Sequence, residues 1–275
     1  MKILVTGANG YLGSGIVKRL LDDDMEVIAT DIKTNNIDNR ATIVQCDLFN
    51  EKDIAKKLHN PDVVLHLAWR DGFVHNSNIH IDDLPSHFHF IEAMAMSGIK
   101  RITIMGSMHE IGFFEGSIDE NTPCNPMSLY GISKNALHES AQLICNQYKI
   151  PLQWLRGFYI VSDSQYGSSI FSKIVVAEKE GKKSFPFTMG QNQYDFLDYE
   201  DFCHQVTATV EQGRVVGTIN ICSGRPEKLA DRVERFIDDN EYSVRLDYGK
   251  FPDRPYDSKA IWGNEEKIQS ILHKL

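Results

Sequence analysis

The stretch Lys2-Ile3-Leu4-Val5-Thr6-Gly7-Ala8-Asn9-Gly10-Tyr11-Leu12-Gly13 decides the fold of this chain. An apolar, β-branched run leads into three glycines, and residues 13–21 then carry apolar side chains at helical spacing. Gly7 permits a tight turn, Gly10 lets a pyrophosphate approach the backbone, and Gly13 allows a helix to pack closely on a strand. The stretch therefore predicts a strand, turn and helix that bind a dinucleotide, with a purely structural glycine turn as the alternative.

The flanking sequence continues this pattern. Over the first 105 residues, short β-branched runs alternate with longer stretches of helical periodicity, which is typical of right-handed βαβ units on a parallel sheet. We expect strands at 2–6, 26–31, 42–45, 63–67, 101–106 and 153–157, and helices at 13–21, 52–58, 84–97 and 128–148. The predicted fold class is α/β, a Rossmann-type doubly wound parallel sheet with a small C-terminal substrate-binding lobe.

The composition changes beyond residue 160, where Gly, aromatic and mixed-charge residues increase and apolar runs shorten. We therefore expect two parts. Residues 1–160 form the dinucleotide-binding Rossmann domain, and residues 161–275 form a smaller lobe that closes over the carboxyl ends of the strands and binds substrate. The two parts are expected to be interleaved, so that neither is independent.

The overall composition narrows the function classes. The chain has 275 residues, 42% of them hydrophobic, and a net charge of −9, which argues against a nucleic-acid surface. No apolar run reaches the roughly 20 residues that a membrane span requires, and the N-terminus does not resemble a signal peptide. Five widely spaced cysteines without a Cys-x-x-Cys motif indicate reduced thiols. We expect a cytoplasmic enzyme that binds neither membrane nor nucleic acid.

The end of the second expected strand bears on the choice of cofactor. Asp31 lies at the interval from the glycines at which a carboxylate accepts hydrogen bonds from an adenosine ribose. A carboxylate there repels a 2′-phosphate, so NAD(H) is favoured over NADP(H). Lys33 and Arg40 are nearby cations that weaken this preference, and an Asp that merely caps a turn is the alternative.

Tyr130 and Lys134 are separated by four residues at the start of an expected helix, which places both side chains on one face. A nearby ammonium stabilises tyrosinate, as a general acid/base at a carbinol or carbonyl oxygen requires. Ser107 follows an expected strand and would emerge at the same edge of the sheet. Tyr-x-x-x-Lys alone is usually helix surface, but the three residues together predict an acid/base site.

At this point the chain resembles the extended short-chain dehydrogenase/reductase family, in its NAD-dependent nucleotide-sugar epimerase, dehydratase and ketoreductase branch. Besides the glycines, Asp47-Leu48 is similar to the adenine-contacting pair, and His66-Leu67-Ala68 to the segment beside the nicotinamide. Ser107 falls five residues before Gly112, as the catalytic Ser or Thr of the family does. The resemblance implies a cofactor site made of Gly7, Asn9, Gly10, Tyr11, Leu12, Gly13, Asp31, Asp47, Leu48, Leu67, Ala68 and Lys134.

The resemblance also implies the roles of the acid/base residues. Tyr130 would donate and accept the proton, Lys134 would bind the nicotinamide ribose, and Ser107 would hold the reacting oxygen. In the carboxyl half, residues 194–196 and 220–224 resemble family segments, and Arg254-Pro-Tyr-Asp257 is similar to a diphosphate-binding turn. The expected substrate contacts are Arg70, His109, Phe158 and Arg254, and no metal is expected.

Departures from the family pattern limit the reaction. Dehydratases of the branch carry Asp and Glu directly after the catalytic Ser or Thr, whereas this chain has Met108 and His109, so dehydration is disfavoured. His109 either faces the sugar or holds the loop. Tyr194 stands where many members carry an Arg for the diphosphate, so phosphate binding falls to other residues or the substrate lacks a diphosphate.

The function favoured by these features is hydride transfer to or from a keto or hydroxyl carbon of a nucleotide-activated deoxyhexose, by a 4-ketoreductase or dehydrogenase. One alternative is an NAD-dependent nucleotide-sugar 4-epimerase. Another is a catalytically silent NAD(H)-binding sensor, because fold alone does not fix function. By resemblance we also expect a homodimer that pairs the helices at 84–97 and 128–148 with those of a second copy.

Overall fold

The computed structural model describes residues 1–51, 53–165, 169–252 and 257–273. Its main sheet has seven parallel strands in the order β11-β7-β5-β4-β1-β2-β3, so the chain starts in the middle and winds outward in both directions. The Rossmann-type prediction is confirmed. The strands are β1 (Lys2–Thr6), β2 (Glu26–Asp31), β3 (Thr42–Gln45), β4 (Val63–His66), β5 (Arg101–Ser107), β7 (Leu152–Gly157) and β11 (Gly217–Ile221).

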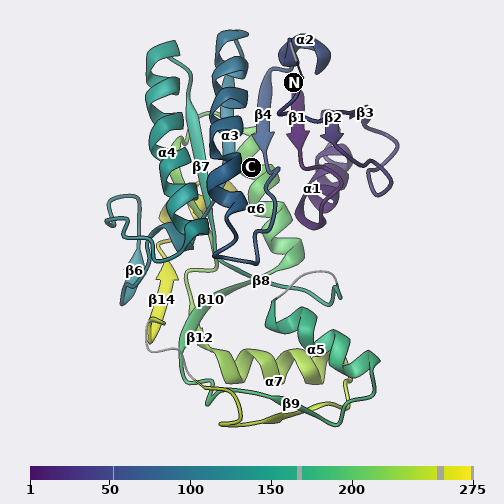
Figure 1. Cartoon of the computed structure of the whole chain (residues 1–275), viewed down its shortest axis with the longest axis vertical. Helices are drawn as coiled ribbons and strands as arrows, with labels where there is room; N and C mark the ends of the chain where they lie inside the picture. The colour runs from purple at the N-terminus through teal and green to yellow at the C-terminus, as the bar shows by residue number, and fades with distance from the viewer. Residues whose placement is uncertain (52, 166–168, 253–256, 274–275) are drawn as a thin grey trace.

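Helices cover both faces of this sheet because alternate strand residues point to opposite sides (Figure 1). Ile3 and Val5 of β1 belong to the core beneath α1 and α6, whereas Leu4 belongs to the core beneath α3 and α4. The first layer holds α1 (Tyr11–Asp22), α6 (Tyr199–Glu211) and α8 (Glu266–Leu272). The second layer holds α2 (Ile54–Lys57), α3 (Ile79–Met96) and α4 (Leu129–Tyr148).

The expected elements differ from the observed ones mainly at their ends. β5 continues one residue further than expected and includes Ser107, and a 3-10 turn, η1 (Met108–Glu110), follows at once. α3 begins at Ile79, five residues earlier than expected, and accommodates Pro85 in its interior. α2 is only four residues long. These shifts leave every expected strand and helix in its place in the sequence.

The remaining strands and helices build the smaller lobe at the bottom of Figure 1. Its sheet has the order β12-β10-β14-β6, with β8 paired to β10, and β9 and β13 form a separate pair. The strands are β6 (Gly116–Ile118), β8 (Tyr159–Val161), β9 (Ser184–Pro186), β10 (Gln193–Asp198), β12 (Pro226–Lys228), β13 (Arg245–Asp247) and β14 (Ala260–Gly263). The helices are α5 (Ile170–Lys179) and α7 (Leu229–Asp239).

The chain crosses between the two parts several times. β6 comes from the first half of the chain but pairs with β14 of the smaller lobe, whereas β11, from the second half, pairs with β7 at the edge of the main sheet. α6 then packs against α1, on the main sheet. These crossings tie the lobe to the carboxyl edge of the main sheet.

Asp195 of β10 anchors the lobe through one fully buried carboxylate. It accepts hydrogen bonds from Ser223 N and Ser223 Oγ at 2.7 Å, Gly224 N at 3.0 Å and Gly263 N at 3.1 Å. Burial raises the pKa of this carboxyl group, although the hydrogen bonds from Ser223 act in the opposite direction. One side chain therefore holds together β10, the turn after β11 and the end of β14.

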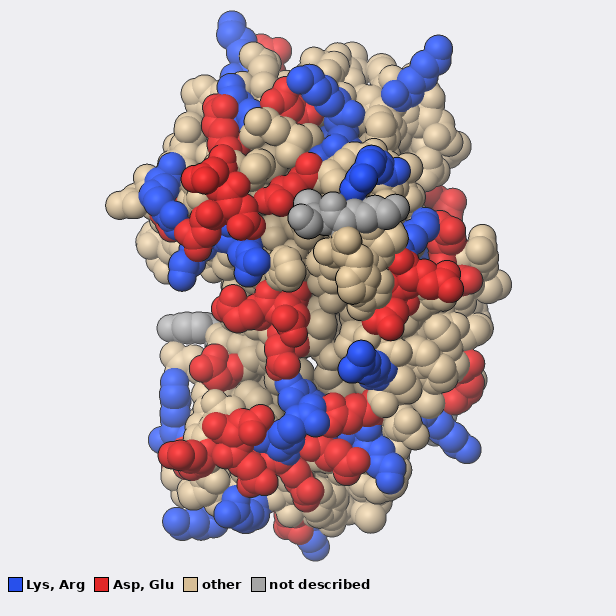
Figure 2. Space-filling view, turned by 180° about the vertical axis from the view of Figure 1, so that it is seen from behind, with Lys and Arg blue, Asp and Glu red and all other residues tan. Residues whose placement is uncertain are grey.

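The outer surface carries charges of both signs, and Figure 2 shows acidic side chains on both lobes with Lys and Arg interspersed among them. In the part of the chain that the structure describes, no helix is long and apolar enough to cross a membrane.

Replacing Asp195 with Ala should destabilise the fold by about 3 kcal/mol, because four donors, one buried and three partly buried, lose their acceptor. The measurement is urea denaturation followed by circular dichroism. Asp201→Ala, which removes an exposed carboxylate from the first turn of α6, is the matched control and should cost less than about 1 kcal/mol. Equal stability of the two variants would contradict the anchoring role.

Candidate active site

The predicted site segments meet at the carboxyl ends of three adjacent parallel strands. Gly7 follows β1, Leu67 and Ala68 follow β4, and Ser107 ends β5. Pairing in register places Thr6 beside His66 and His66 beside Ile104, so the three strands end close to one another. Segments that are about 100 residues apart in sequence therefore share one edge of the sheet.

The glycine loop has a shape that only glycine allows at two positions. Gly7 has a φ of +68°, and a Cβ added there would lie 2.7 Å from Ala68 N. A Cβ at Gly13 would lie 2.1 Å from Gly7 O. α1 begins with Gly10 at its N-cap, and no side chain caps its first turn. The loop thus fits a dinucleotide pyrophosphate, which would bind to the backbone N–H groups at the start of α1, at Tyr11 and Leu12.

Asp31 lies directly beside this loop. Its carboxylate accepts hydrogen bonds from Asn9 N at 3.0 Å and from Ile32 N at 2.7 Å. Arg40, the cation that could favour a 2′-phosphate, is held in ion pairs with Asp38 and Asp22. Asp31 therefore places a carboxylate beside the glycine loop, and the charge of Arg40 is balanced by two carboxylates.

The pair after β3 lies in a turn. Asp47 accepts a hydrogen bond from Phe49 N at 3.2 Å and one from Asn50 Nδ2 at 2.7 Å, and Leu48 packs partly on the core beneath α3. Asp47 and Leu48 therefore lie in the turn directly after β3, which is an edge strand of the main sheet.

Tyr130 and Lys134 lie on the first turns of α4, as their spacing predicts. Ser128 caps the helix by accepting a hydrogen bond from Gly131 N at 3.1 Å, and Tyr130 N donates to His75 O at 2.8 Å. Lys134 is 3% exposed, and its Nζ donates to Met105 O at 2.7 Å. The Ser107 side chain hydrogen-bonds Tyr130, so the structure brings all three predicted acid/base residues together.

Burial opposes the charged forms of both groups on α4. It raises the pKa of Tyr130 to about 12, although the hydrogen bond with Ser107 acts in the opposite direction. It lowers the pKa of Lys134 to about 7. The Lys134 ammonium lies 5.8 Å from the centre of the Tyr130 ring, so its positive charge would favour a tyrosinate at that position.

Beneath Lys134 lies a stack of rings that rests on two buried histidines. The Lys134 ammonium is 3.7 Å from the centre of the Trp69 ring, which stacks on His87 at 4.4 Å. Thr6 Oγ accepts from Leu67 N and Ala68 N, which leaves its hydrogen for His66 Nδ1 at 2.8 Å. His66 Nε2 then donates to His87 Nδ1 at 2.8 Å.

Both histidines are neutral in this arrangement. Burial lowers the pKa of His87 to about 3 and that of His66 well below its ordinary value, and the positive charge of Lys134 acts in the same direction. The hydrogen-bonded series Thr6, His66 and His87 below the site is therefore uncharged, and Lys134 lies above it.

Two histidines and two tyrosines form an aromatic wall beside Tyr130. The His75 ring stacks on Tyr130 at 5.4 Å and lies 4.3 Å from His109. Tyr159 lies 6.3 Å from His109 and 4.8 Å from Tyr194. The sequence analysis named His109 but missed His75 and Tyr159. Their positions after β4 and β7, at the same sheet edge as Ser107, are the signal that could have found them.

The other expected substrate residues have different surroundings. Arg70 Nε donates to Asp83 Oδ2 at 2.7 Å in a partly exposed ion pair with α3. Phe158 belongs to the core, so its neighbour Tyr159 is the aromatic residue beside His109. Arg254 lies outside the described residues. Among residues 1–51, 53–165, 169–252 and 257–273, no cluster of His, Cys, Asp or Glu side chains is placed to hold a metal ion.

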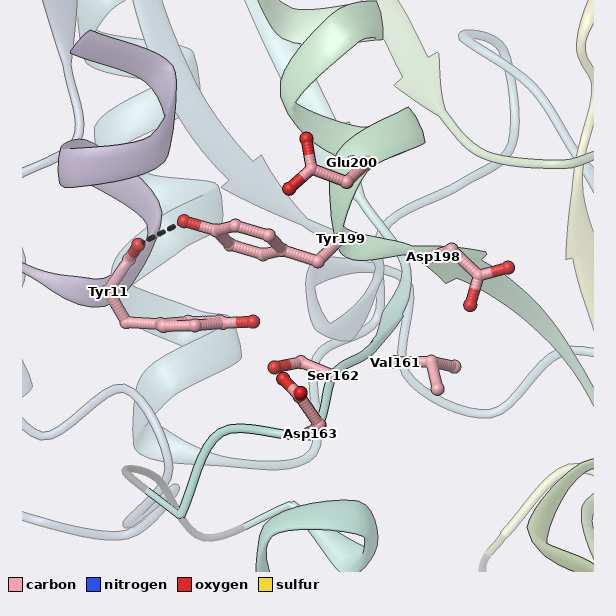
Figure 3. Close-up of a pocket in the computed structure, with 7 residues that line it drawn as sticks. All are labelled: Tyr11, Val161, Ser162, Asp163, Asp198, Tyr199 and Glu200. Carbon is pink, nitrogen blue, oxygen red and sulfur yellow. Dashed lines mark hydrogen bonds between the residues drawn. The ribbon is translucent and has the colours of Figure 1, made fainter. Parts of the chain in front are cut away.

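A cavity of about 450 Å³ lies between the glycine loop and the smaller lobe (Figure 3). Tyr11 and Tyr199 stack at 4.4 Å, and the Tyr199 hydroxyl donates to Tyr11 O at 2.6 Å. The carboxylates among its lining residues, Asp163, Asp198 and Glu200, disfavour a phosphate. None of the acid/base residues lines it, so the cavity is separate from the chemistry.

Comparisons with known proteins agree with this geometry. Residues 3–222 match the model of the NAD-dependent epimerase/dehydratase family. The chain is 38% identical over 269 residues to a dTDP-6-deoxy-L-talose 4-dehydrogenase (NAD(+)) from Aggregatibacter actinomycetemcomitans, which covers 96% of this chain and 99% of the relative.

Solved structures share the fold at low sequence identity. A UDP-glucose 4-epimerase from Thermotoga maritima, solved with UDP-glucose, has a TM-score of 0.83 at 20% identity and covers 98% of this chain and 92% of its own. A dTDP-glucose 4,6-dehydratase from Streptomyces venezuelae, solved with NAD, has a TM-score of 0.83 at 21% identity, over 98% and 90%. The glycine loop, the Ser107, Tyr130 and Lys134 arrangement and these matches together show that the chain belongs to the NAD-dependent epimerase/dehydratase family.

Proposed function

We propose that this chain is an NAD-dependent oxidoreductase that interconverts a hydroxyl and a keto group at C4 of a nucleotide-activated deoxyhexose. The observation that carries the proposal is the meeting of Ser107, Tyr130 and Lys134 at the sheet edge that also bears the glycine loop. The 38% identity to the talose 4-dehydrogenase over nearly its full length supports the substrate class and the position of the reacting carbon.

The cofactor would lie along the carboxyl edge of the sheet, and when bound it accepts or supplies the hydride. Gly7, Gly10 and Gly13 leave room for its backbone-bound pyrophosphate, and Asp31 would accept hydrogen bonds from the adenosine ribose. The full set proposed to hold it is Gly7, Asn9, Gly10, Tyr11, Leu12, Gly13, Asp31, Asp47, Leu48, Leu67, Ala68 and Lys134.

The acid/base residues move one proton at the substrate oxygen. In oxidation, Tyr130 takes the proton from the C4 hydroxyl as the hydride leaves C4, and in reduction it returns that proton to the oxygen. Ser107 donates a hydrogen bond to the same oxygen and stabilises the charge that develops on it. The Lys134 ammonium stabilises the tyrosinate, which offsets the burial that opposes this form.

The sugar would be recognised by the aromatic wall next to Tyr130. His75, His109 and Tyr159 carry hydrogen-bonding groups on flat apolar rings, a combination that suits a deoxysugar with few hydroxyls. Arg70 and Arg254 remain proposed contacts for the charged part of the substrate. Phe158 would not contact the sugar itself, but would support this wall by packing beneath it in the core.

We also propose a cytoplasmic homodimer. α3 and α4 pack side by side and expose the apolar side chains of Ile81, Met96, Ile132 and Leu143, which a second copy would cover. The five cysteines are free, as in a reducing compartment. A monomer mass in analytical ultracentrifugation at micromolar concentration would contradict the dimer.

The direct test follows absorbance at 340 nm with NAD⁺ or NADH and a panel of dTDP- and UDP-linked 6-deoxyhexoses and their 4-keto forms, with products identified by NMR. Stoichiometric change in NADH with one of these sugars is the expected result. Interconversion of C4 epimers without net change in NADH would favour the epimerase alternative. NADH binding without turnover of any sugar would favour the silent sensor.

Replacing Tyr130 with Phe should lower kcat at least about a hundredfold, because the proton acceptor is lost while the ring packing is kept. NADH affinity, measured by fluorescence titration, should stay within about twofold. Tyr148→Phe, at the other end of α4, is the matched control and should retain wild-type kcat. Turnover of Tyr130→Phe at the wild-type rate would refute the mechanism.

Replacing Asp31 with Ala should raise the use of NADPH relative to NADH about tenfold or more, because a carboxylate that repels the 2′-phosphate is removed. The measurement is kcat/KM for each cofactor. Glu26→Ala removes an exposed carboxylate from the opposite end of β2 and should leave the ratio unchanged. An unchanged ratio in Asp31→Ala would show that Asp31 does not face the ribose.

A further inference from the structure

A fully buried carboxylate lies directly behind the acid/base residues and has no role in the proposed mechanism. Glu110 ends η1, three residues after Ser107, and is 0% exposed. Trp154 and Arg156 of β7 donate hydrogen bonds to this carboxylate. It therefore cannot reach a substrate, unlike the Asp and Glu with which dehydratases eliminate water.

Glu110 fixes the direction of the Ser107 hydroxyl through a reciprocal cap. Glu110 Oε1 accepts a hydrogen bond from Ser107 N at 3.3 Å, and Ser107 Oγ accepts one from His109 N at 3.3 Å. Because Ser107 Oγ already accepts at this position, its hydrogen is left for Tyr130 or the substrate oxygen. The cap thus orients the only proton that the Ser107 side chain can donate.

Rigid neighbours hold the carboxylate in place and keep it ionised. Trp154 Nε1 donates to Oε1 at 2.9 Å and to Oε2 at 3.0 Å, Arg156 Nε donates to Oε1 at 3.2 Å, and His138 Nδ1 lies 3.5 Å from Oε2. Burial alone would raise the pKa of Glu110, but His138, Arg156 and Trp154 outweigh it and hold the pKa below its ordinary value. Glu110 is therefore a buried anion at neutral pH.

The negative charge of Glu110 acts on both Tyr130 and Lys134 of α4. The negative charge of Glu110 raises the pKa of Lys134 and that of Tyr130, and so favours the protonated form of each. The titratable and charged groups that face it are Arg156 on β7, His138, Lys134 and Tyr130 on α4, and Cys124 on the loop before α4. Without Glu110, burial alone would drive Lys134 toward its neutral form.

We propose that Glu110 is a positioning residue, whose carboxylate orients the Ser107 hydroxyl and supplies a buried negative charge that favours the ammonium form of Lys134. The inference rests on the proposed function of Ser107, Tyr130 and Lys134. In this proposal, one buried side chain both orients Ser107 and supplies a negative charge near Tyr130 and Lys134.

Two variants separate the charge from the geometry. In Glu110→Gln, the amide oxygen can still accept from Ser107 N, Trp154 and Arg156, while the NH₂ group faces His138 Nδ1. In Glu110→Asp, the charge remains but the side chain is one methylene too short to reach Ser107 N and the β7 donors together. The measurement for each is the pH profile of kcat/KM in the oxidation direction, where the rising limb reports loss of a proton from the Tyr130–Lys134 pair.

The expected results differ between the two variants. Loss of a negative charge makes deprotonation of the pair easier, so the rising limb of Glu110→Gln should move to lower pH by about half a unit to one unit. Glu110→Asp should keep the wild-type limb but lose about tenfold to a hundredfold in kcat, with KM for the sugar nucleotide unchanged. A purely structural role would lower activity at all pH values in both variants without moving the limb.

Asp195→Asn is the matched control, since it neutralises another fully buried carboxylate without touching Ser107, and the rising limb of its pH profile should stay in place. A folded Glu110→Gln with the wild-type profile would overturn the inference, as would Glu110→Asp with wild-type kcat even if the Gln variant does not fold. If Tyr130→Phe is inactive while both Glu110 variants behave as wild type, only this inference falls. If Tyr130→Phe is active, the proposed function itself falls.

Discussion

The parallel, in-register pairing of β1, β4 and β5 is the constraint on which the rest of the site depends. Parallel strands bring all their carboxyl ends to one edge, so Gly7, Ala68 and Ser107 meet there although they are far apart in sequence. The contact is close enough that a Cβ on Gly7 would collide with the backbone of Ala68. A shift of one residue in the register of β5 would turn Ser107 to the other face of the sheet and separate it from Tyr130.

The charges of the site are set by burial and by a few compensating partners. Burial pushes Tyr130 and Lys134 toward their neutral forms, and the His66–His87 pair below them is neutral for the same reason. Against this, the Trp69 ring face and the Glu110 carboxylate favour the ammonium form of Lys134. The charge state of Lys134 is therefore set by the balance between burial and these two neighbours.

The neighbours of the site differ from those expected of a protein that binds a diphosphate mainly through arginine. Tyr194, which stands where the family resemblance led us to look for an Arg, lies 4.8 Å from the Tyr159 ring, and His75 and His109 continue this aromatic wall to Tyr130. Flat rings with single polar atoms recognise sugar faces and isolated hydroxyls better than dense charge. This wall is where the chain would distinguish a deoxyhexose from a fully hydroxylated sugar.

The sequence alone determined the fold class and the order of the strands and helices of the first half, and it supplied the residues proposed as the acid/base set, because these follow from local rules. Glycine spacing, β-branched runs and a four-residue helical spacing are all read within about 20 residues. Only the tertiary structure decided what surrounds that set. His75, Tyr159 and Glu110 belong to no motif that assigns them a role, since their roles come from long-range packing of loops and strands on α4. The same reason explains why Phe158 and Tyr159, adjacent in sequence, have different surroundings: neighbouring residues of an extended chain point to opposite sides, and only the packing decides which side is core.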